Sequence, residues 1–210
     1  MVIEFYHDVL CAWCYALSPR LRKIVKEYPD IEVIHKAFPL APEHRDLSEM
    51  FGNKYKAKEE ILNHWRAANA NDDEHRINAE LMAMRDFDYP YSMPGLMSCK
   101  AAELQGGQEA HWDYFDRVQK AHLTDCENIA DQNVLINCAE TIGLDIDKFI
   151  EDFQSEKVRN MVMEDYDYAR KSGVTATPTL IIDRKWIISG AVKYEELKQA
   201  IEEIITGKLE

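Results

Sequence analysis

Two cysteines three residues apart, Cys11 and Cys14, stand where a short β-favouring run gives way to a helical repeat. Residues 2–6 are apolar or aromatic except for Glu4, and after Cys11 apolar side chains recur at three- and four-residue intervals as far as Tyr28. This pattern predicts a strand that runs directly into a helix, with both thiols on the first helical turn. Unpaired N–H groups and the positive end of the helix dipole stabilise an anion there.

The spacing of the two cysteines is weak evidence by itself, whereas their position is strong evidence. The five cysteines of the 210-residue chain form about ten pairs, so coincidence produces this spacing in about one chain in ten. A strand-to-helix junction is different, because it favours a reactive thiolate. We therefore predict that Cys11 is the reactive sulfur. Cys14, beside Trp13 and Leu17, is predicted to be more buried, to have a higher pKa and to resolve a mixed disulfide.

The order of the predicted elements is strand, helix, strand, a long run of helices, then strand, strand and helix. Residues 31–38 close a βαβ unit, whose crossover helix forces its two strands to be parallel. From Ser48 to about Ser172 the apolar spacing is helical. Strands at 179–182 and 186–189 then precede an amphipathic helix at 194–205.

These elements predict an α/β fold in which a large helical insertion separates a βαβ unit from a ββα unit. We predict one domain formed by residues 1–42 and 173–210, and an inserted helical subdomain formed by residues 43–172. Helix stops inside the insertion are expected at Gly106-Gly107 and at Gly143, and Asp131 is expected to cap a helix.

The composition limits the cellular compartments and the classes of binding partner that we expect for this chain. The chain has 25 Lys and Arg against 38 Asp and Glu, a formal net charge of −13, which repels nucleic-acid phosphates and anionic lipid headgroups. No run approaches the roughly 18 apolar residues of a membrane-spanning helix. Glu4 lies where a signal peptide would have its apolar centre. We expect a cytoplasmic protein, with neither nucleic acid nor membrane as partner.

Other groups that could bind a metal lack the expected spacing. Cys99, Cys126 and Cys138 form no second close pair, so a zinc site built on Cys11 and Cys14 would lack ligands. We predict no metal site and a structural role for these three cysteines. Core or solvated positions are expected for the histidines, which show no close pair of ligands: His7, His35, His64, His75, His111 and His122. Core packing rather than a substrate groove is expected for Trp65, Tyr89, Tyr91, Trp112, Tyr114 and Phe115.

Two motifs together resemble a known family. They are Asp8-Val9-Leu10-Cys11-Ala12-Trp13-Cys14-Tyr15 and Gly173-Val174-Thr175-Ala176-Thr177-Pro178-Thr179. This combination resembles the DsbA-like branch of the thioredoxin superfamily over nearly the whole chain. Within that branch it is similar to the FrnE-like proteins, which are related to 2-hydroxychromene-2-carboxylate isomerases and kappa-class glutathione transferases. The predicted α/β fold is therefore thioredoxin-like.

The resemblance also implies roles for residues of the second motif. Pro178 is expected to be a cis-proline that faces the cysteine pair, and the Thr177 backbone to hold an extended substrate. The Thr177 hydroxyl is expected to hydrogen-bond the reactive sulfur. Trp13 stands where periplasmic DsbA has a histidine, so the resemblance does not imply that this chain has the redox potential of that enzyme. The predicted site is Cys11 and Cys14 as catalytic residues, with Trp13, Thr177 and Pro178 binding substrate.

The leading hypothesis is a thiol–disulfide oxidoreductase that works in an unassigned direction. Its partner is a disulfide or thiol, in a protein or a small molecule, with glutathione as a possible redox partner and no other cofactor. The alternative is a glutathione-dependent isomerase or transferase of the kappa or chromene type, which needs no second cysteine. A third hypothesis is a redox-silent binding module. The oligomeric state is left open.

Overall fold

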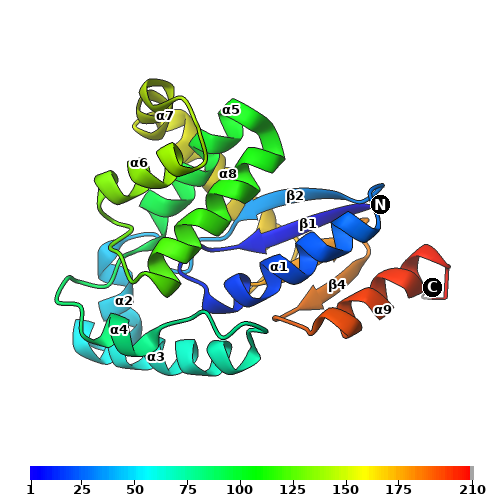
Figure 1. Ribbon diagram of the computed structural model, residues 1–210, viewed down its shortest axis with the longest axis horizontal. Coiled ribbons are helices and arrows are strands. Elements are labelled where there is room, and N and C mark those ends of the chain that lie inside the picture. The colour runs from blue at the N-terminus through cyan, green and yellow to red at the C-terminus, as the bar shows by residue number, and fades with distance from the viewer. Residues whose placement is uncertain (209–210) are drawn as a thin grey trace.

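The computed structural model describes residues 1–208, and its centre is a four-stranded sheet of order β2-β1-β3-β4 (Figure 1). Strands β1 (Val2–His7) and β2 (Glu32–Ala37) are parallel. Strands β3 (Thr179–Ile182) and β4 (Trp186–Ser189) follow as antiparallel neighbours, β3 against β1 and β4 against β3. The strand positions predicted from the sequence are confirmed, and so is the thioredoxin-like α/β fold.

Helices α1 (Ala12–Glu27) and α9 (Tyr194–Ile205) complete the βαβ and ββα units. Helix α1 begins one residue after Cys11 and crosses one face of the sheet, with α9 beside it (Figure 1). Their contact is partly polar, because the Tyr194 hydroxyl and the Lys198 ammonium both bind the carboxylate of Glu27. Both helices place apolar side chains on the same core.

The residues between β2 and β3 are helical, as the apolar spacing predicted. The elements are α2 (His44–Phe51), α3 (Lys54–Asn71), α4 (Ala79–Ala83), α5 (Ser92–Gln119), the π-helical turn η1 (Lys120–Thr124), α6 (Gln132–Thr141), α7 (Ile146–Phe153) and α8 (Glu156–Lys171). The expected stops are confirmed: Asp131 caps α6, and Gly143 follows it with a positive φ. The division into domains at residues 42 and 173 stays a prediction.

The sheet has a different helical cover on each face. Phe5 and His7 point to the face that α1 and the second half of α5 cover, where Phe115 packs on both rings. On the opposite face Tyr6 and Ile181 pack with Ala169 of α8. Alternation along β1 thus divides the buried side chains between two layers.

The outer edge of β2 is covered by side chains of the insertion. The backbone N–H of His35 donates to Gln108 Oε1 at 2.7 Å, and the N–H of Ala37 donates to Asp165 Oδ2 at 3.1 Å. Lys100 Nζ donates to the His35 carbonyl at 3.4 Å. Because an exposed strand edge has unpaired backbone groups, these bonds from α5 and α8 complete the sheet on that side.

Helix α5 is interrupted at Gly106 and Gly107, and Gly107 has a φ of 67°. That left-handed conformation favours glycine. The break lets the first half of α5 reach the edge of β2 while its second half lies against the sheet face.

The first half of α5 also approaches the loop between β1 and α1 very closely. A Cβ built on Gly95 would lie 2.6 Å from Cγ2 of Val9. We expect Gly95→Ala to lower the free energy of unfolding by about 1–3 kcal/mol, because an added methyl overpacks the contact. Denaturant unfolding of the reduced protein measures the loss. In a Val9→Ala background, which removes the overlapping methyl groups, the same substitution should cost less, and an equal cost in both backgrounds would contradict this explanation.

Candidate functional site

Cys11 is the N-cap residue that immediately precedes α1. Its carbonyl accepts from the N–H groups of Cys14 at 3.0 Å and Tyr15 at 3.3 Å, and its own N–H donates to the Asp8 carbonyl at 3.1 Å. The Cys11 sulfur therefore lies at the helix start, where N–H groups without intrahelical partners stabilise negative charge. Cys11 is 6% exposed and Cys14 is fully buried. Both are free thiols.

The segment before β3 lies against this helix start. The Thr177–Pro178 peptide bond is cis, as predicted. The Cys11 thiol donates to the Thr177 carbonyl at 3.4 Å. The expected bond from the Thr177 hydroxyl to the sulfur is not formed in this geometry, where the hydroxyl oxygen is buried without a hydrogen-bond partner, but the Thr177 side chain still favours the Cys11 thiolate.

The two thiols have opposite shifts in pKa. Burial raises the pKa of Cys11, but the side chains of Cys14 and Thr177 and the Cys14 backbone N–H stabilise the thiolate more, so its pKa lies below the ordinary value. Burial and the neighbouring Cys11 hold the pKa of Cys14 well above its ordinary value. Of the two sulfurs, Cys11 is therefore the one that forms a thiolate more readily, and Cys14 is the one that keeps its proton.

Asp8 connects three segments around the cysteine pair. Its carboxylate accepts from the N–H of Leu10 at 3.0 Å, the N–H of Leu40 at 2.6 Å and the hydroxyl of Ser92 at 2.6 Å. Burial raises the pKa of Asp8 to about 6, although these hydrogen bonds oppose the shift. The β1–α1 loop, the segment after β2 and the start of α5 are thus held by one carboxyl group.

Gln119, at the end of α5, holds the same loop from a different side. Its side-chain amide donates to the Cys11 carbonyl at 2.9 Å and to the Asp8 and Val9 carbonyls at 3.3 and 3.4 Å. Sequence reasoning did not assign a role to Gln119 or to Asp8. Asp8 could have been found from its place three residues before Cys11, whereas Gln119 lies 108 residues from Cys11 in an ordinary helical pattern.

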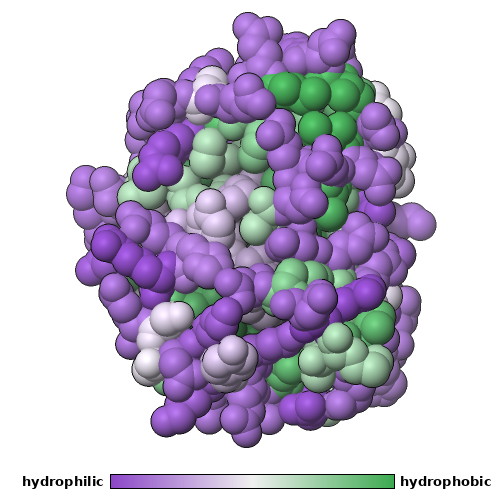
Figure 2. Space-filling model, turned by 90° about the vertical axis from the view of Figure 1, so that its left-hand side faces the viewer, coloured by the Kyte–Doolittle hydropathy of each residue, from purple (hydrophilic) through white to green (hydrophobic). Residues whose placement is uncertain are grey.

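A cavity of about 290 Å³ lies directly over Cys11. Its wall comes from the helix start, from the segment before β3 and from α2 and α3 of the insertion, and it is mostly apolar. The lining residues are Leu10, Cys11, Ala12, Trp13, Leu40, Leu47, Met50, Phe51, Ile61, His64, Trp65, Tyr89 and Thr177. Figure 2 looks onto the side of the molecule where these helices lie and shows apolar patches separated by hydrophilic side chains.

The cavity corrects part of the prediction for the aromatic residues. Trp112, Tyr114 and Phe115 are buried core residues, as expected. Trp65 and Tyr89 are also buried, but their rings line the cavity over Cys11. Trp13 is half-buried and lines the same cavity. Of the predicted site residues, Cys11, Trp13 and Thr177 meet at this cavity, while Cys14 and Pro178 lie buried beside it.

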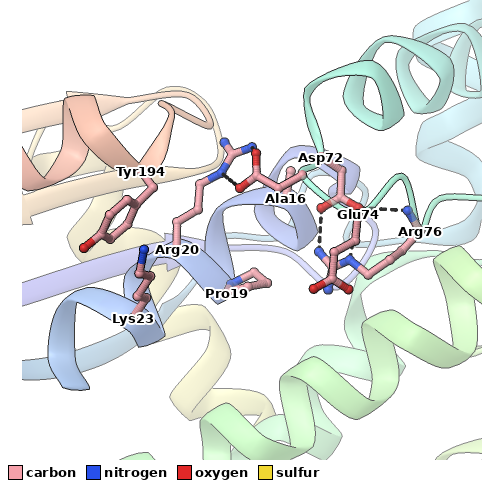
Figure 3. A pocket seen from close by; sticks show the side chains of 9 residues that line it. Ala16, Pro19, Arg20, Lys23, Asp72, Glu74, Arg76 and Tyr194 are labelled. Atoms are coloured by element: carbon pink, nitrogen blue, oxygen red, sulfur yellow. Dashed lines mark hydrogen bonds and ion pairs between the residues drawn. The ribbon is translucent and has the colours of Figure 1, made fainter. Parts of the chain in front are cut away.

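A second pocket, of about 260 Å³, lies on the other side of α1, and four of its charged residues, Arg20, Asp72, Asp73 and Arg76, form ion pairs (Figure 3). Arg20, only 2% exposed, forms two 2.8 Å bonds with Asp73, and it also binds the Ala191 carbonyl at 3.0 Å. Arg76 binds Asp72 at 2.6 Å. The Arg20 bonds fasten α1 to the segment after α3 and to the segment before α9, and Arg76 also binds the Tyr15 carbonyl of α1, so these groups have a structural role.

The other cysteines and most histidines stay outside the cavity. Burial raises the pKa of Cys99 well above its ordinary value, and raises those of Cys126 and Cys138 to about 11. Such thiols are poor nucleophiles. His122 lies behind the cavity, with Nε2 at 3.0 Å from the Tyr89 hydroxyl.

Three histidines that sequence reasoning treated separately come together in the structure. The donor nitrogens of His7, His35 and His111 lie within 4.8 Å of one another, and all three residues are fully buried. They come from β1, β2 and the second half of α5. The three residues lie in the core, as expected, but their proximity was not predicted, because strand pairing and helix packing create a closeness that sequence spacing does not show.

The fold and the site together define a thioredoxin-fold protein with a Cys-x-x-Cys pair at the start of its first helix. The chain belongs to the DSBA-like thioredoxin domain family, whose model matches residues 2–202. Within residues 1–208, every helix is too short or too polar to cross a membrane.

Several known proteins are similar over nearly the whole chain. The ClpXP adapter protein SpxH of Bacillus subtilis (strain 168) is 24% identical over 214 residues, which cover 97% of this chain and 67% of SpxH. The cytosolic disulfide reductase DsbM from Pseudomonas aeruginosa has a TM-score of 0.74 and 19% identity, with 98% of this chain and 99% of DsbM covered. A structure of DsbM with GSH is also similar. A 2-hydroxychromene-2-carboxylate isomerase gives a TM-score of 0.72 and 16% identity, with 99% and 98% covered. The solved structures show a shared fold.

We expect Asp8→Asn to lower the pKa of the Cys11 thiol, because the carboxylate charge of Asp8 raises it. The thiolate of the variant should therefore persist to lower pH. The rate of Cys11 alkylation by iodoacetamide, followed against pH by peptide mass spectrometry, measures the shift. Asp30→Asn, an exposed substitution beyond the far end of α1, serves as the control and should leave the profile unchanged. A profile shifted to higher pH in Asp8→Asn would contradict the expectation.

Proposed function

We propose that the chain is a thiol–disulfide oxidoreductase in which Cys11 is the nucleophile and Cys14 the resolving thiol. The observation that supports this most is the opposite shift in pKa of the two sulfurs, one at the helix start and one buried a turn further. A low pKa increases the thiolate fraction at the attacking sulfur. A high pKa at Cys14 delays its attack until Cys11 has formed a mixed disulfide.

The proposed reaction has two exchange steps. The Cys11 thiolate attacks one sulfur of a substrate disulfide, forms a mixed disulfide and releases the other substrate sulfur as a thiolate. Cys14 then loses its proton and attacks the Cys11 sulfur, which releases the second substrate thiolate and leaves a Cys11–Cys14 disulfide. Two electrons pass from the enzyme dithiol to the substrate, and the reverse sequence oxidises a dithiol. A 30 mV difference in potential corresponds to about 1.4 kcal/mol, so equilibration with glutathione redox buffers is needed to assign the direction.

The cavity supports a substrate that presents apolar groups beside its sulfur. Most of its lining is aliphatic or aromatic. The lining contains neither Lys nor Arg, and His64 is its one basic side chain. Two exposed apolar side chains, Leu40 and Met50, lie at the same cavity. Glutathione carries two carboxylates and would gain little from such walls. A disulfide flanked by apolar residues of a polypeptide fits them better, and the similarity to DsbM, a cytosolic disulfide reductase, favours a reducing, cytoplasmic setting.

We expect Cys14→Ser to accumulate a mixed disulfide between Cys11 and its substrate, because the resolving attack is lost while the nucleophile remains. Cys11→Ser should form none. Non-reducing electrophoresis and mass spectrometry of both variants, incubated with an insulin-type disulfide substrate, distinguish them. Full turnover by Cys14→Ser with glutathione and an electrophile would support the isomerase or transferase alternative instead. Unchanged function in Cys11→Ser would point to a redox-silent binding module instead, and the similar protein SpxH is named as a ClpXP adapter protein.

We expect Met50→Glu to lower kcat/KM for a disulfide peptide with apolar flanking residues by about tenfold, which corresponds to about 1.4 kcal/mol. The reason is that a carboxylate would replace apolar surface at the cavity, where Met50 is 55% exposed. Met84→Glu is the matched control, because Met84 is 75% exposed and lies outside the cavity. Steady-state kinetics with apolar and polar peptides provide the measurement. Equal losses for both variants, or for both peptides, would contradict a role for the apolar wall.

A further inference from the structure

Three imidazole rings form a compact cluster under the sheet face that α5 covers. His7 is the last residue of β1, His35 lies on the neighbouring strand β2, and His111 lies on α5. Their ring centroids are 4.8–5.2 Å apart. All three residues are fully buried, so protein atoms surround each ring on all sides. The cluster plays no part in the proposed disulfide exchange.

Half of the ring nitrogens in this cluster lack hydrogen-bond partners. Nδ1 of His7 and both Nδ1 and Nε2 of His35 are buried without one. A buried polar atom without a partner costs about 1–3 kcal/mol, and native proteins contain few of them. Phenylalanine, which is present nearby as Phe5 and Phe115, would fill this part of the core without leaving polar atoms unpaired. The unpaired nitrogens are therefore better explained as donors to a ligand than as ordinary core packing.

The third histidine is held in the manner of a metal ligand. Nδ1 of His111 lies 2.7 Å from Glu103 Oε2, which leaves Nε2 directed at the other rings. Metal-bound histidines usually donate their second ring N–H to a carboxylate in this way, and the contact fixes the tautomer and the ring orientation. Glu103 is itself held by Lys100, which also binds Asp165.

The distances agree with one small ion. Nε2 of His7 and Nε2 of His111 are 3.2 Å apart. Two nitrogens that bind one tetrahedral zinc ion at 2.0–2.1 Å are separated by about 3.3 Å. A nitrogen of His35 lies within 4.8 Å of both, so a modest movement of one ring completes a three-nitrogen set. Imidazole donors select zinc and similar transition ions over Mg²⁺ or Ca²⁺, which prefer oxygen.

We propose that His7, His35 and His111 form a binding site for a divalent transition metal ion of the zinc class, with Glu103 as the positioning residue for His111. The ion would join the end of β1 to β2 and to the second half of α5. Only Asp8, Val9 and Leu10 separate His7 from Cys11. The site would thus brace the strand from which the cysteine helix starts, without contributing to the exchange chemistry.

The test uses full-length protein in which Cys11 and Cys14 are both replaced by serine, so that thiolates of the exchange site cannot bind the metal. We expect one equivalent of Co²⁺ or Zn²⁺ per chain after metal-free preparation. Bound Co²⁺ should show visible d–d bands of a nitrogen-ligated site without the near-ultraviolet thiolate band. Zn²⁺ should also raise the melting temperature. Absence of stoichiometric metal in this protein, or a thiolate band in its cobalt spectrum, would overturn the proposal.

Matched variants separate ligation from packing. His35→Phe fills the same space and should bind no metal while it folds normally, as judged by circular dichroism. Glu103→Gln keeps the three imidazoles and should bind about 10–100-fold more weakly. His64→Phe removes an exposed histidine of the Cys11 cavity and should bind like its parent. A metal affinity equal to that of the parent protein in His35→Phe or in Glu103→Gln would overturn the proposal. A variant that no longer binds Zn²⁺ should also show no rise in melting temperature when Zn²⁺ is added.

Discussion

The contact between the Cys11 thiol and the Thr177 carbonyl depends on how β1 is placed in the sheet. Strand β1 is central and pairs with β3 in the antiparallel sense, so that Tyr6 near its end is opposite Thr179 at the start of β3. The chain therefore leaves β1 and enters β3 at the same end of the strands. That geometry brings together two segments 166 residues apart. The insertion can be long because it begins and ends near this end of the sheet.

The helical insertion has three structural functions. Its α2 and α3 side chains build the apolar wall over Cys11, while α5 and α8 supply the hydrogen bonds that cover the edge of β2. Helix α5 also holds the cysteine loop through Gln119 and approaches it at Gly95. The thioredoxin-like core positions the sulfurs, and the insertion determines what surrounds them.

Local sequence patterns were sufficient for the strands, for the helix that starts after Cys11 and for the helix boundaries at Gly106-Gly107, Asp131 and Gly143. Spacing, turn residues and caps such as Asp131 act over a few residues, so a single sequence shows them. Thr177 and cis-Pro178 were found through a family resemblance. The cavity wall, the role of Gln119 and the meeting of His7 with His35 and His111 depend on contacts between distant segments. Neither periodicity nor composition contains that information, and the contact between the Cys11 thiol and the Thr177 carbonyl depends on distant segments in the same way.

The two edges of the sheet differ in a way that affects association between molecules. The β2 edge is occupied by side chains of the same chain, whereas β4 is a four-residue strand whose Ile187 is 60% exposed. Within residues 1–208, another extended polypeptide could therefore add to the sheet only along β4. Growth of the sheet by strand addition is directed away from the helical insertion, and the shortness of β4 restricts any such addition to a few hydrogen bonds.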